Sequence, residues 1–389
     1  MSAPTKLPVW ADAPTDPVPG LPGTVHPIAE PSDAVKHQGW VGERPPLNVF
    51  NWWMNLVYQW IEWLISTPSK QISAMTAFTP IAAPLTTIVK LVENLTGDMM
   101  AIGLLGSTPT CAFSANRGLT WTTSTPYFVG GDTTAIVALG YSGSNWIVGN
   151  DLGHFCYSGG GTTWTTSTGS GSGAIVSIVG NATYCLATDA SNNILVSSNA
   201  GVAFSTTVAS KGTLLAMSAS GAVCWDPAAG GVWTSSSTFT SWTLNSQSFD
   251  SYGGVGALSF VNSGGAGKYF LFPNMTSSTQ TIYTSVNGGT TWLQYSSTIA
   301  NTFRCAGISG YGPNILFAYG LDEANSGIAC FVFSVDGGTS WNEIAFDLWA
   351  SISSAFFSVV TFQTFFAISS NAGRPALIFQ SPLFPVISA

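Results

Sequence analysis

The stretch "SVDGGTSW", from Ser334 to Trp341, is nearly identical to "SVNGGTTW", from Ser285 to Trp292. Both follow one template: Ser, any residue, Asn or Asp, any residue, Gly, any residue, Thr or Ser, and Trp. A repeat of this kind is either a duplicated catalytic loop or one structural unit that is stacked several times. Weaker copies of the octet along the chain decide between these two interpretations.

Four weaker copies precede the two sharp octets. They are "SANRGLTW" (Ser114–Trp121), "YSGGGTTW" (Tyr157–Trp164), "SSNAGVAF" (Ser197–Phe204) and "SSSTFTSW" (Ser235–Trp242). The aromatic residues that end the six octets are separated by 43, 40, 38, 50 and 49 residues. This interval is the period of a β-propeller blade, so the octets predict a stacked unit.

The segments between the octets repeat as well. Residues 86–114 align with residues 133–158, and both consist of short β-branched and aromatic runs that Gly, Ser and Asn punctuate. Such runs predict four strands per unit, with the octet as the hairpin between the third and fourth strands. The last unit has three strand-like runs, and "LFPVISA" at the C-terminus is its expected fourth strand. The sequence therefore predicts a mainly β protein with a seven-bladed propeller over residues 85–389; six blades and an irregular end are the alternative.

The composition of the octet has a physical reason. Gly289 and Gly338 are expected to provide a positive φ. The Ser hydroxyl and the Asn or Asp side chain can bind turn amides that otherwise lack partners. The Trp is expected to pack between neighbouring blades.

The octets resemble the Asp-box, or BNR, repeat of sialidases, sortilin-type receptors and several non-enzymatic propellers. The resemblance covers roughly residues 86 to 389. It implies a structural role on the rim, away from the ligand face. The residues to which it assigns this role are Ser114, Asn116, Gly118, Trp121, Trp164, Ser197, Asn199, Gly201, Trp242, Ser285, Asn287, Gly289, Trp292, Ser334, Asp336, Gly338 and Trp341.

Composition excludes several classes of protein. Charged residues make up 7% of the chain and hydrophobic residues 46%, which is unlike a disordered acidic tail. A net charge of −8 without a basic cluster argues against nucleic-acid binding. The six cysteines form no metal-binding pattern, so we expect buried reduced thiols, no metal and no cofactor. They are Cys111, Cys156, Cys185, Cys224, Cys305 and Cys330.

The sequence contains few groups that could form a catalytic site. A sialidase-like site needs three arginines, and the predicted propeller has only Arg304 and Arg374 outside its octets. A glycosidase with two carboxylates is harder to exclude, although we expect these loop carboxylates to cap turns or face solvent. The candidates are Asp132, Asp151, Asp189, Asp226, Asp250, Asp322 and Glu323, of which Asp132 and Asp250 are expected nearest the propeller axis. His154 is expected to be a strand residue, so we predict no catalytic residue.

The N-terminal region is different. Residues 1–46 are rich in Pro and predict an extended arm without a core of its own. Residues 47–84 predict a Trp-rich helix that Asn48 caps, followed by a short helix and linker over residues 71–84. The helix is apolar around most of its circumference, so it must be buried against its own propeller, symmetry mates or another protein. Its Trp density favours an assembly interface. Polar residues interrupt it too often for a membrane span.

The pattern Gly-Trp, Pro-Pro and Asn-Trp-Trp in this region resembles an N-terminal module of tailed-bacteriophage virion proteins, such as tail fibres and tailspikes. In that family the N-terminus docks on the particle, the distal part meets the host, and trimers are usual. The chain departs from the family in lacking a fibre shaft. The interface residues that we predict from this resemblance and from the helix are Gly39, Trp40, Pro45, Pro46, Phe50, Asn51, Trp52, Trp53, Asn55, Trp60 and Trp63.

We therefore expect a non-enzymatic structural protein of a phage virion that lacks an export signal and a membrane segment. Its partners would be tail or capsid proteins, further copies of itself, most simply as a trimer, and a host surface glycan. One alternative is a glycan-cleaving propeller enzyme of a phage tail. Another is a lectin or assembly scaffold outside phages, which should carry an export or transit sequence.

Overall fold

A computed structural model describes most of the chain after residue 78. The described residues are 79–82, 84–94, 96–116, 118–131, 134–245, 247, 249, 255–261, 267–273, 279–300, 303–311, 315–322, 328–334, 336–344, 355–360, 365–370 and 377–380. The chain divides into two units, Met1–Met75 and Thr76–Ala389, and every described residue belongs to the second. Within these residues the only helical element is the 3-10 turn η3 (Val129–Gly131).

The described strands form seven four-stranded antiparallel sheets. Sheet 1 contains β2 (Thr87–Glu93), β3 (Met99–Leu105), β4 (Thr108–Ser114) and β5 (Thr122–Ser124). Sheet 2 contains β6 (Ile136–Ser142), β7 (Asn145–Asn150), β8 (Phe155–Ser158) and β9 (Thr165–Thr166). Sheet 3 contains β10 (Ile175–Gly180), β11 (Cys185–Asp189), β12 (Ile194–Ser197) and β13 (Thr206–Val208). Sheet 4 contains β14 (Leu214–Met217), β15 (Gly221–Asp226), β16 (Gly231–Ser236) and β17 (Thr243–Asn245).

The last three sheets have the same construction. Sheet 5 contains β18 (Val255–Val261), β19 (Lys268–Pro273), β20 (Thr279–Ser285) and β21 (Leu293–Ala300). Sheet 6 contains β22 (Phe303–Tyr311), β23 (Ile315–Asp322), β24 (Ile328–Ser334) and β25 (Asn342–Ile344). Sheet 7 contains β26 (Ala355–Val360), β27 (Phe365–Ser370), β28 (Leu377–Gln380) and β1 (Thr79–Ala82). In sheets 1 to 6 the octet connects the third strand to the fourth, as the sequence predicts.

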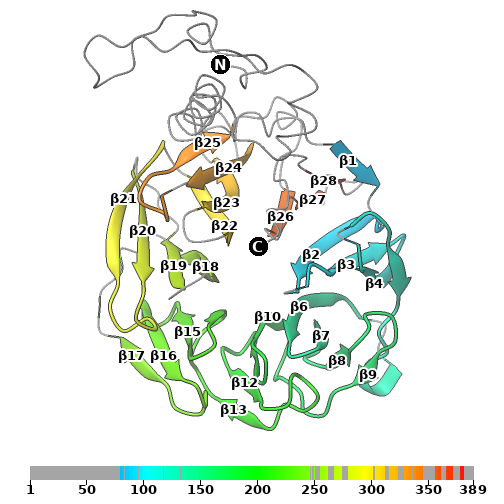
Figure 1. The fold of residues 1–389 in the computed structure, drawn as a ribbon. Coiled ribbons are helices and arrows are strands. Elements are labelled where there is room, and N and C mark those ends of the chain that lie inside the picture. Colours follow the sequence, from blue (N-terminus) through cyan, green and yellow to red (C-terminus); the bar gives the residue numbers. More distant parts are fainter. Residues whose placement is uncertain are drawn as a thin grey trace, which may run out of the picture. The chain divides into compact units, whose positions relative to one another are not determined.

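The sheets follow one another around a closed cycle (Figure 1). The first strand of each sheet contacts the first strand of the next, in the order β2, β6, β10, β14, β18, β22 and β26, and β26 contacts β2 again. Figure 1 shows these first strands around the middle of the cycle and the fourth strands at its periphery. The single connection of each sheet to the next thus produces a ring in which no sheet lacks neighbours.

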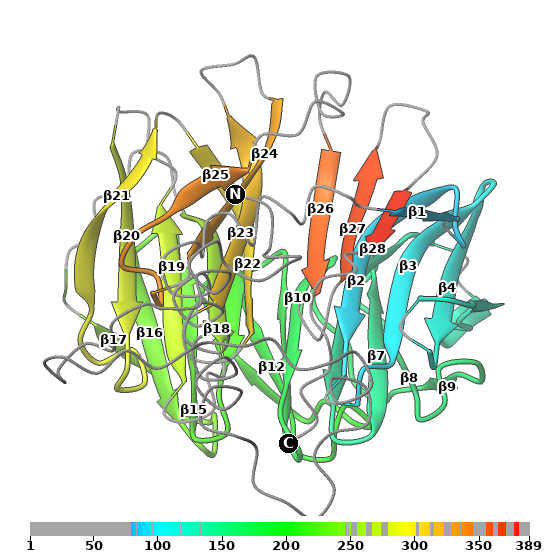
Figure 2. The same ribbon diagram turned by 45° about the horizontal axis from the view of Figure 1, so that its top comes forward.

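The ring is closed by a strand from before the first sheet. β1 pairs with β28 in an antiparallel register in which Thr79 lies opposite Gln380 and Ala82 opposite Leu377. The tilted view of Figure 2 shows β1 beside β28 and the strand β2 that follows it. The fourth strand of sheet 7 is therefore β1, and the expectation that "LFPVISA" fills this position is wrong. Sheet structure also begins before residue 85, inside the segment predicted as a linker.

The core lies between neighbouring sheets, so the second strands are buried on both faces. All six residues of β15 are buried, for example. Val223 and Trp225 of β15 pack with Tyr269 and Leu271 of β19 in one apolar cluster. Each second strand consequently has an almost continuous apolar sequence in place of a hydrophobic–polar alternation.

The thiols of five cysteines lie in these cores and form no disulfide; they are Cys111, Cys156, Cys185, Cys224 and Cys305. Burial raises the pKa of the Cys156 thiol to about 12 and also raises the pKa values of Cys111, Cys185 and Cys224. Such thiols pack as small apolar side chains. The prediction of buried reduced thiols is confirmed for these five. The side chain of Cys330 lies outside the description.

Candidate binding face

The octet hairpins share one hydrogen bond between the first Ser and the Gly four residues later. The Ser hydroxyl accepts from the backbone N–H of that Gly in four octets, at 2.8 Å in Ser114–Gly118, 3.0 Å in Ser197–Gly201, 2.9 Å in Ser285–Gly289 and 2.8 Å in Ser334–Gly338. These four serines are almost completely buried. The hydroxyl thus satisfies an amide that would otherwise be orphaned inside the turn.

The third octet residue binds the other end of the turn. Its side-chain oxygen accepts from the backbone N–H four residues later, at 2.8 Å in Asn116–Thr120, 2.9 Å in Asn199–Ala203, 3.0 Å in Asn287–Thr291 and 2.9 Å in Asp336–Ser340. Burial opposes ionisation of Asp336, but hydrogen bonds from Ser340, Ser334 and Thr339 lower the pKa of its carboxyl group below the ordinary value. Asn and Asp are therefore interchangeable for this turn.

Two separate constraints act on the octet glycines: a positive φ, and a lack of room for a Cβ. Their φ angles are 80° at Gly118, 83° at Gly201, 82° at Gly289 and 92° at Gly338, all in the region that side chains disfavour. Gly201 and Gly289 also lie against the preceding sheet. A Cβ there would be 2.4 Å from Ile147 Cγ1 and 2.7 Å from Val223 Cγ2, respectively. The octet glycine is thus a point of contact between sheets.

The octet tryptophans turn back over their own glycines. The indole Nε1 donates to the carbonyl oxygen three residues earlier, at 2.9 Å in Trp121–Gly118, 2.9 Å in Trp292–Gly289 and 3.1 Å in Trp341–Gly338. Trp292 and Trp341 are buried in the clusters between their sheet and the one before it. Phe204, which replaces Trp in its octet, stacks on Phe155 of the preceding sheet at 4.0 Å between ring centroids.

The two most divergent octets keep the geometry with other residues. In the copy that ends at Trp164, the hydroxyl of Ser158 accepts from Gly161 N at 2.8 Å, and the indole donates to Ser124 of the preceding sheet at 2.9 Å. In the copy that ends at Trp242, buried Phe239 occupies the Gly position with a φ of 57°, and the indole donates to its carbonyl at 3.0 Å. The hydrogen-bonding groups of the octets are therefore used within the fold.

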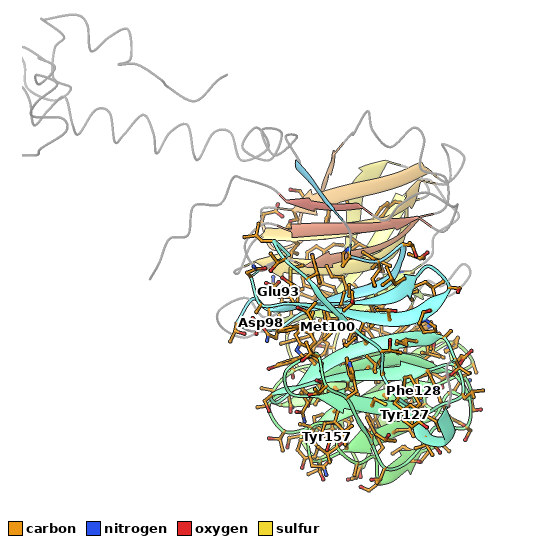
Figure 3. The ribbon with its side chains drawn as sticks, turned by 90° about the vertical axis from the view of Figure 1, so that its right-hand side faces the viewer. Glu93, Asp98, Met100, Tyr127, Phe128 and Tyr157 are labelled. Carbon is orange, nitrogen blue, oxygen red and sulfur yellow. The ribbon has the colours of Figure 1, made fainter. Side chains whose placement is uncertain are left out.

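The octets and the turns between first and second strands lie on one face of the ring. Asn145 Nδ2 donates to Ala200 O at 3.0 Å, and Ala200 N donates to Thr183 O at 2.8 Å. We call this the hairpin face. The opposite face, here called the loop face, carries the connections β3–β4, β5–β6, β7–β8, β9–β10, β11–β12, β13–β14 and β15–β16, as far as they are described. Figure 3 shows Asp98 of the β2–β3 turn and Tyr127 of the β5–β6 connection toward opposite sides.

Three equivalent residues begin the turns of the loop face at the ends of second strands. Asn150 Oδ1 accepts from the amides of Leu152 and His154, at 3.1 and 2.7 Å. Asp189 and Asp226 accept from the amides of their own turns in the same way. The expectation that these carboxylates cap turns is confirmed for Asp189 and Asp226. Asn150 was missed, although its place before "DLGH" gives the same signal.

Asp189 is the most enclosed of these groups, with no exposed surface. Burial opposes its ionisation, but hydrogen bonds from Ser172, Asn193 and Ser191 lower the pKa of its carboxyl group below the ordinary value. Ser172 N lies 2.8 Å from Asp189 Oδ2 and belongs to the preceding connection β9–β10. The ionised carboxylate thus joins two loops and is a poor proton donor.

Backbone hydrogen bonds join the connections of the loop face into one surface. Asp151 N donates to Ala135 O at 3.1 Å, and Gly171 N donates to Gly153 O at 2.9 Å. Lys211 N donates to Asn192 O at 2.8 Å, which continues the row into sheet 4. Lys211 Nζ also lies 3.4 Å from the ring centroid of Trp233, whose Nε1 donates to Asp226 at 2.9 Å. These bonds give a rigid surface over sheets 1 to 4.

The other predicted catalytic candidates are not gathered into a described pair. Asp151 is exposed in the β7–β8 turn, and His154 lies in that turn and not in a strand as expected. The backbones of Asp322 and Arg304 belong to β23 and β22, and their side chains lie outside the description. Asp132, Asp250, Glu323, Arg374 and the whole N-terminal set from Gly39 to Trp63 lie outside the described residues.

The described residues contain no group of three or more His, Cys, Asp or Glu side chains arranged to hold a metal ion. Within the same residues no helix has the length and apolarity to span a membrane.

Solved structures with the same architecture are β-propellers. The chain superposes on YCF48 bound to D1 peptide with a TM-score of 0.56 and 15% identity, over 78% of this chain and 94% of that one. It superposes on the WD40 beta propeller domain of Doa1 with a TM-score of 0.56 and 10% identity, over 78% and 95%. For virginiamycin B lyase from Staphylococcus aureus the TM-score is 0.57 and the identity 10%, over 78% and 99%.

No family model matches the sequence, and no curated protein matches it. At these identities the superpositions show the fold alone. The neighbours include a peptide-bound protein and a lyase, so they leave the choice between binding and catalysis to the residues of the chain itself.

Proposed function

We propose that the chain is a non-enzymatic binding protein of a bacteriophage particle, with a seven-bladed Asp-box propeller that its N-terminal region attaches to the virion. The β-propeller fold itself supports a binding or protein-interaction role. The finer assignment rests on the N-terminal Gly-Trp, Pro-Pro and Asn-Trp-Trp pattern and on the chemistry of the loop face.

The proposal that the chain is not an enzyme rests on one observation: two carboxylates of the loop face are engaged in hydrogen bonds to their own turns. Asp189 and Asp226 each accept at least two backbone amides of their own turn. A glycosidase needs one carboxylic acid whose pKa is raised, so that it can protonate the leaving group. The environment of Asp189 does the opposite and lowers its pKa. These two groups hold loops in place and favour a surface that binds without cleaving.

Seven blades are supported by the closed cycle of the described sheets and by β1, which gives sheet 7 its fourth strand. The chain of residues 1–78 continues from this closing strand toward the N-terminus. A propeller tethered through its closing strand can display its loop face while the preceding segment is held elsewhere. This connectivity favours anchoring through the N-terminal region, with further copies of the chain and tail or capsid proteins as partners.

Particle assembly tests the anchoring. Particles are produced with the full chain or with a chain that lacks residues 1–64, and the amount of propeller in purified particles is measured by quantitative mass spectrometry. A Lys211→Ala variant, altered on the loop face, is the control. We expect the truncated chain to be absent from particles and the control to be incorporated. Normal incorporation of the truncated chain would show that another region attaches it.

A glycan-cleaving enzyme is the second candidate, because Asp151 presents an exposed carboxylate on the loop face. Incubation of the purified chain with host capsule or lipopolysaccharide and measurement of new reducing ends distinguishes the two. Product formation that Asp151→Asn abolishes would establish the enzyme. We expect no new reducing ends with either protein.

A further inference from the structure

One aromatic side chain of the loop face is exposed while both of its neighbours are buried. Tyr127 is 69% exposed, whereas Phe128 is 1% exposed and Pro126 is buried. Figure 3 labels Tyr127 and Phe128 next to each other. A mobile loop would not keep adjacent residues in such different environments, so the backbone around Tyr127 must be fixed by other contacts.

Those contacts come from the next sheet. The carbonyl oxygen of Tyr127 accepts from Cys156 Sγ at 3.1 Å and from Thr166 Oγ1 at 3.1 Å. Phe128 packs in the core cluster of sheets 1 and 2 together with Ile136 and Trp146. The backbone that carries the Tyr127 ring is therefore held in place, so binding to the ring would cost little backbone conformational entropy.

The described surroundings of Tyr127 are polar and carry little charge. The exposed residues described in the connections β5–β6, β7–β8 and β9–β10 are mostly Gly, Ser and Thr, such as Thr125, Ser170 and Ser172. Asp151 is the exposed carboxylate described in these three connections. Such groups donate and accept hydrogen bonds without carrying charge. A ligand that complements them has many hydroxyl groups and no net charge.

The described part of the loop face exposes few large apolar side chains. Besides Tyr127, they are Leu105 at the end of β3, Val129 and Leu152. A stable protein–protein interface buries roughly 800 Å² on each partner around an apolar centre with several anchors. One aromatic ring surrounded by hydroxyl and amide groups instead fits a pyranose, whose C–H face can stack on the ring while its hydroxyls bind the polar surroundings.

We propose that Tyr127 is the stacking platform of a binding site for neutral glycans on the loop face. The inference rests on the proposed binding function and specifies the ligand class and the position of the site. A single ring gives weak binding at one site, and several copies of the chain on one particle would strengthen it through avidity.

Native gel electrophoresis of the purified full chain tests the site. The chain carries a formal net charge of −8 and migrates to the anode, so a neutral polysaccharide cast into the gel retards it only by binding. Dextran, mannan and galactomannan are the probes, and hyaluronan is the anionic comparison. The variants are Tyr127→Ser, which removes the ring, and Tyr127→Phe, which keeps it. Leu119→Ser is the matched control because Leu119 is similarly exposed, at 62%, in an octet of the hairpin face.

We expect at least one neutral polysaccharide to retard the wild-type chain, Tyr127→Phe and Leu119→Ser. For Tyr127→Ser we expect an apparent affinity lower by roughly tenfold or more, in line with other aromatic stacking contacts. Equal retardation of Tyr127→Ser and wild type would overturn the proposal. Retardation by hyaluronan alone, or by no polysaccharide at all, would overturn it too. Because particle incorporation is measured separately, a chain that assembles normally but binds no glycan refutes this site and leaves the anchoring intact.

Discussion

Gly289 lies directly against Val223 of the preceding sheet, so that a Cβ on the glycine would be 2.7 Å from Val223 Cγ2. The contact joins the octet hairpin of sheet 5 to the second strand of sheet 4. It shows that the octet does more than reverse the chain: its glycine also sets how closely two sheets approach. Gly201 has the same relationship to Ile147.

Two adjacent glycines allow the cost of a positive φ to be measured separately from the cost of the close contact between sheets. Gly288 has a φ of 71° and open space where a Cβ would be, whereas Gly289 has a φ of 82° and the contact with Val223. We expect Gly288→Ala to lower the free energy of unfolding by about 1 kcal/mol through backbone strain. Gly289→Ala adds overpacking and is expected to cost at least about 2 kcal/mol. Urea unfolding of both variants measures the difference.

The control for this comparison is Val223→Ala. In that background the clash with Val223 is removed and the milder contact with Thr234 Cγ2, at 3.0 Å, remains. The additional cost of Gly289→Ala should therefore fall toward the cost of Gly288→Ala. Fully additive effects of the two substitutions would show that the contact between the sheets carries no energy.

The indole of Trp292 offers a second test of the hairpin. Its Nε1 donates to Gly289 O at 2.9 Å, and the side chain is 5% exposed. Trp292→Phe removes this hydrogen bond and part of the packing, so we expect a loss of about 1–3 kcal/mol in the free energy of unfolding. Trp121→Phe removes the equivalent bond at a half-buried position and should cost less. Equal losses would mean that burial between sheets is not what the tryptophan contributes.

The repeat could be read from the sequence because its physics is local. Ser285, Asn287, Gly289 and Trp292 interact with one another within eight residues, so their spacing is visible in the chain. The divergent octets carry a weaker signal because residues outside the template occupy its positions. Phe239 takes a conformation that the template reserves for glycine, and no sequence rule predicts that a buried aromatic residue would accept this strain.

Ring closure and the loop face could not be predicted in the same way. β1 and β28 are about 300 residues apart in the chain. A run of four residues that contains Pro80 and is followed by Pro84 carries no strand signal of its own. The exposure of Tyr127 depends on the burial of Phe128 against sheet 2, which is a contact between two sheets. The turn-capping role of Asp189 was predictable from "DASNN", because an Asp that begins a tight turn binds the amides of that turn.

The lowered pKa of Asp189 predicts how the stability of the protein changes with pH. Its folded-state pKa lies below the ordinary value, so its contribution is complete above the unfolded pKa of about 4 and is lost as the pH falls through the folded value. We expect wild type to be more stable than Asp189→Asn by a constant amount from pH 7 to pH 5, and the difference to shrink below about pH 4. Chemical denaturation at several pH values measures this. A difference that grows on acidification would contradict the assigned role.

The closing strand predicts a stability difference between two truncations. A chain that lacks residues 1–64 keeps β1, whereas a chain that lacks residues 1–83 loses it and exposes the edge of β28. We expect the shorter chain to unfold at lower urea concentration and to aggregate more readily, since an unpaired edge is a template for association. Size-exclusion chromatography and urea titration give the readouts. Identical midpoints would mean that β1 does not hold the ring closed.

Electron microscopy of purified native particles, with a gold label on a C-terminal tag of the chain, tests the central claim most directly. The account predicts label at defined, repeated positions on the tail or capsid, each beside a ring-shaped density that projects from the surface. Label that is absent from every particle, with the chain recovered only as a free monomer, would contradict it.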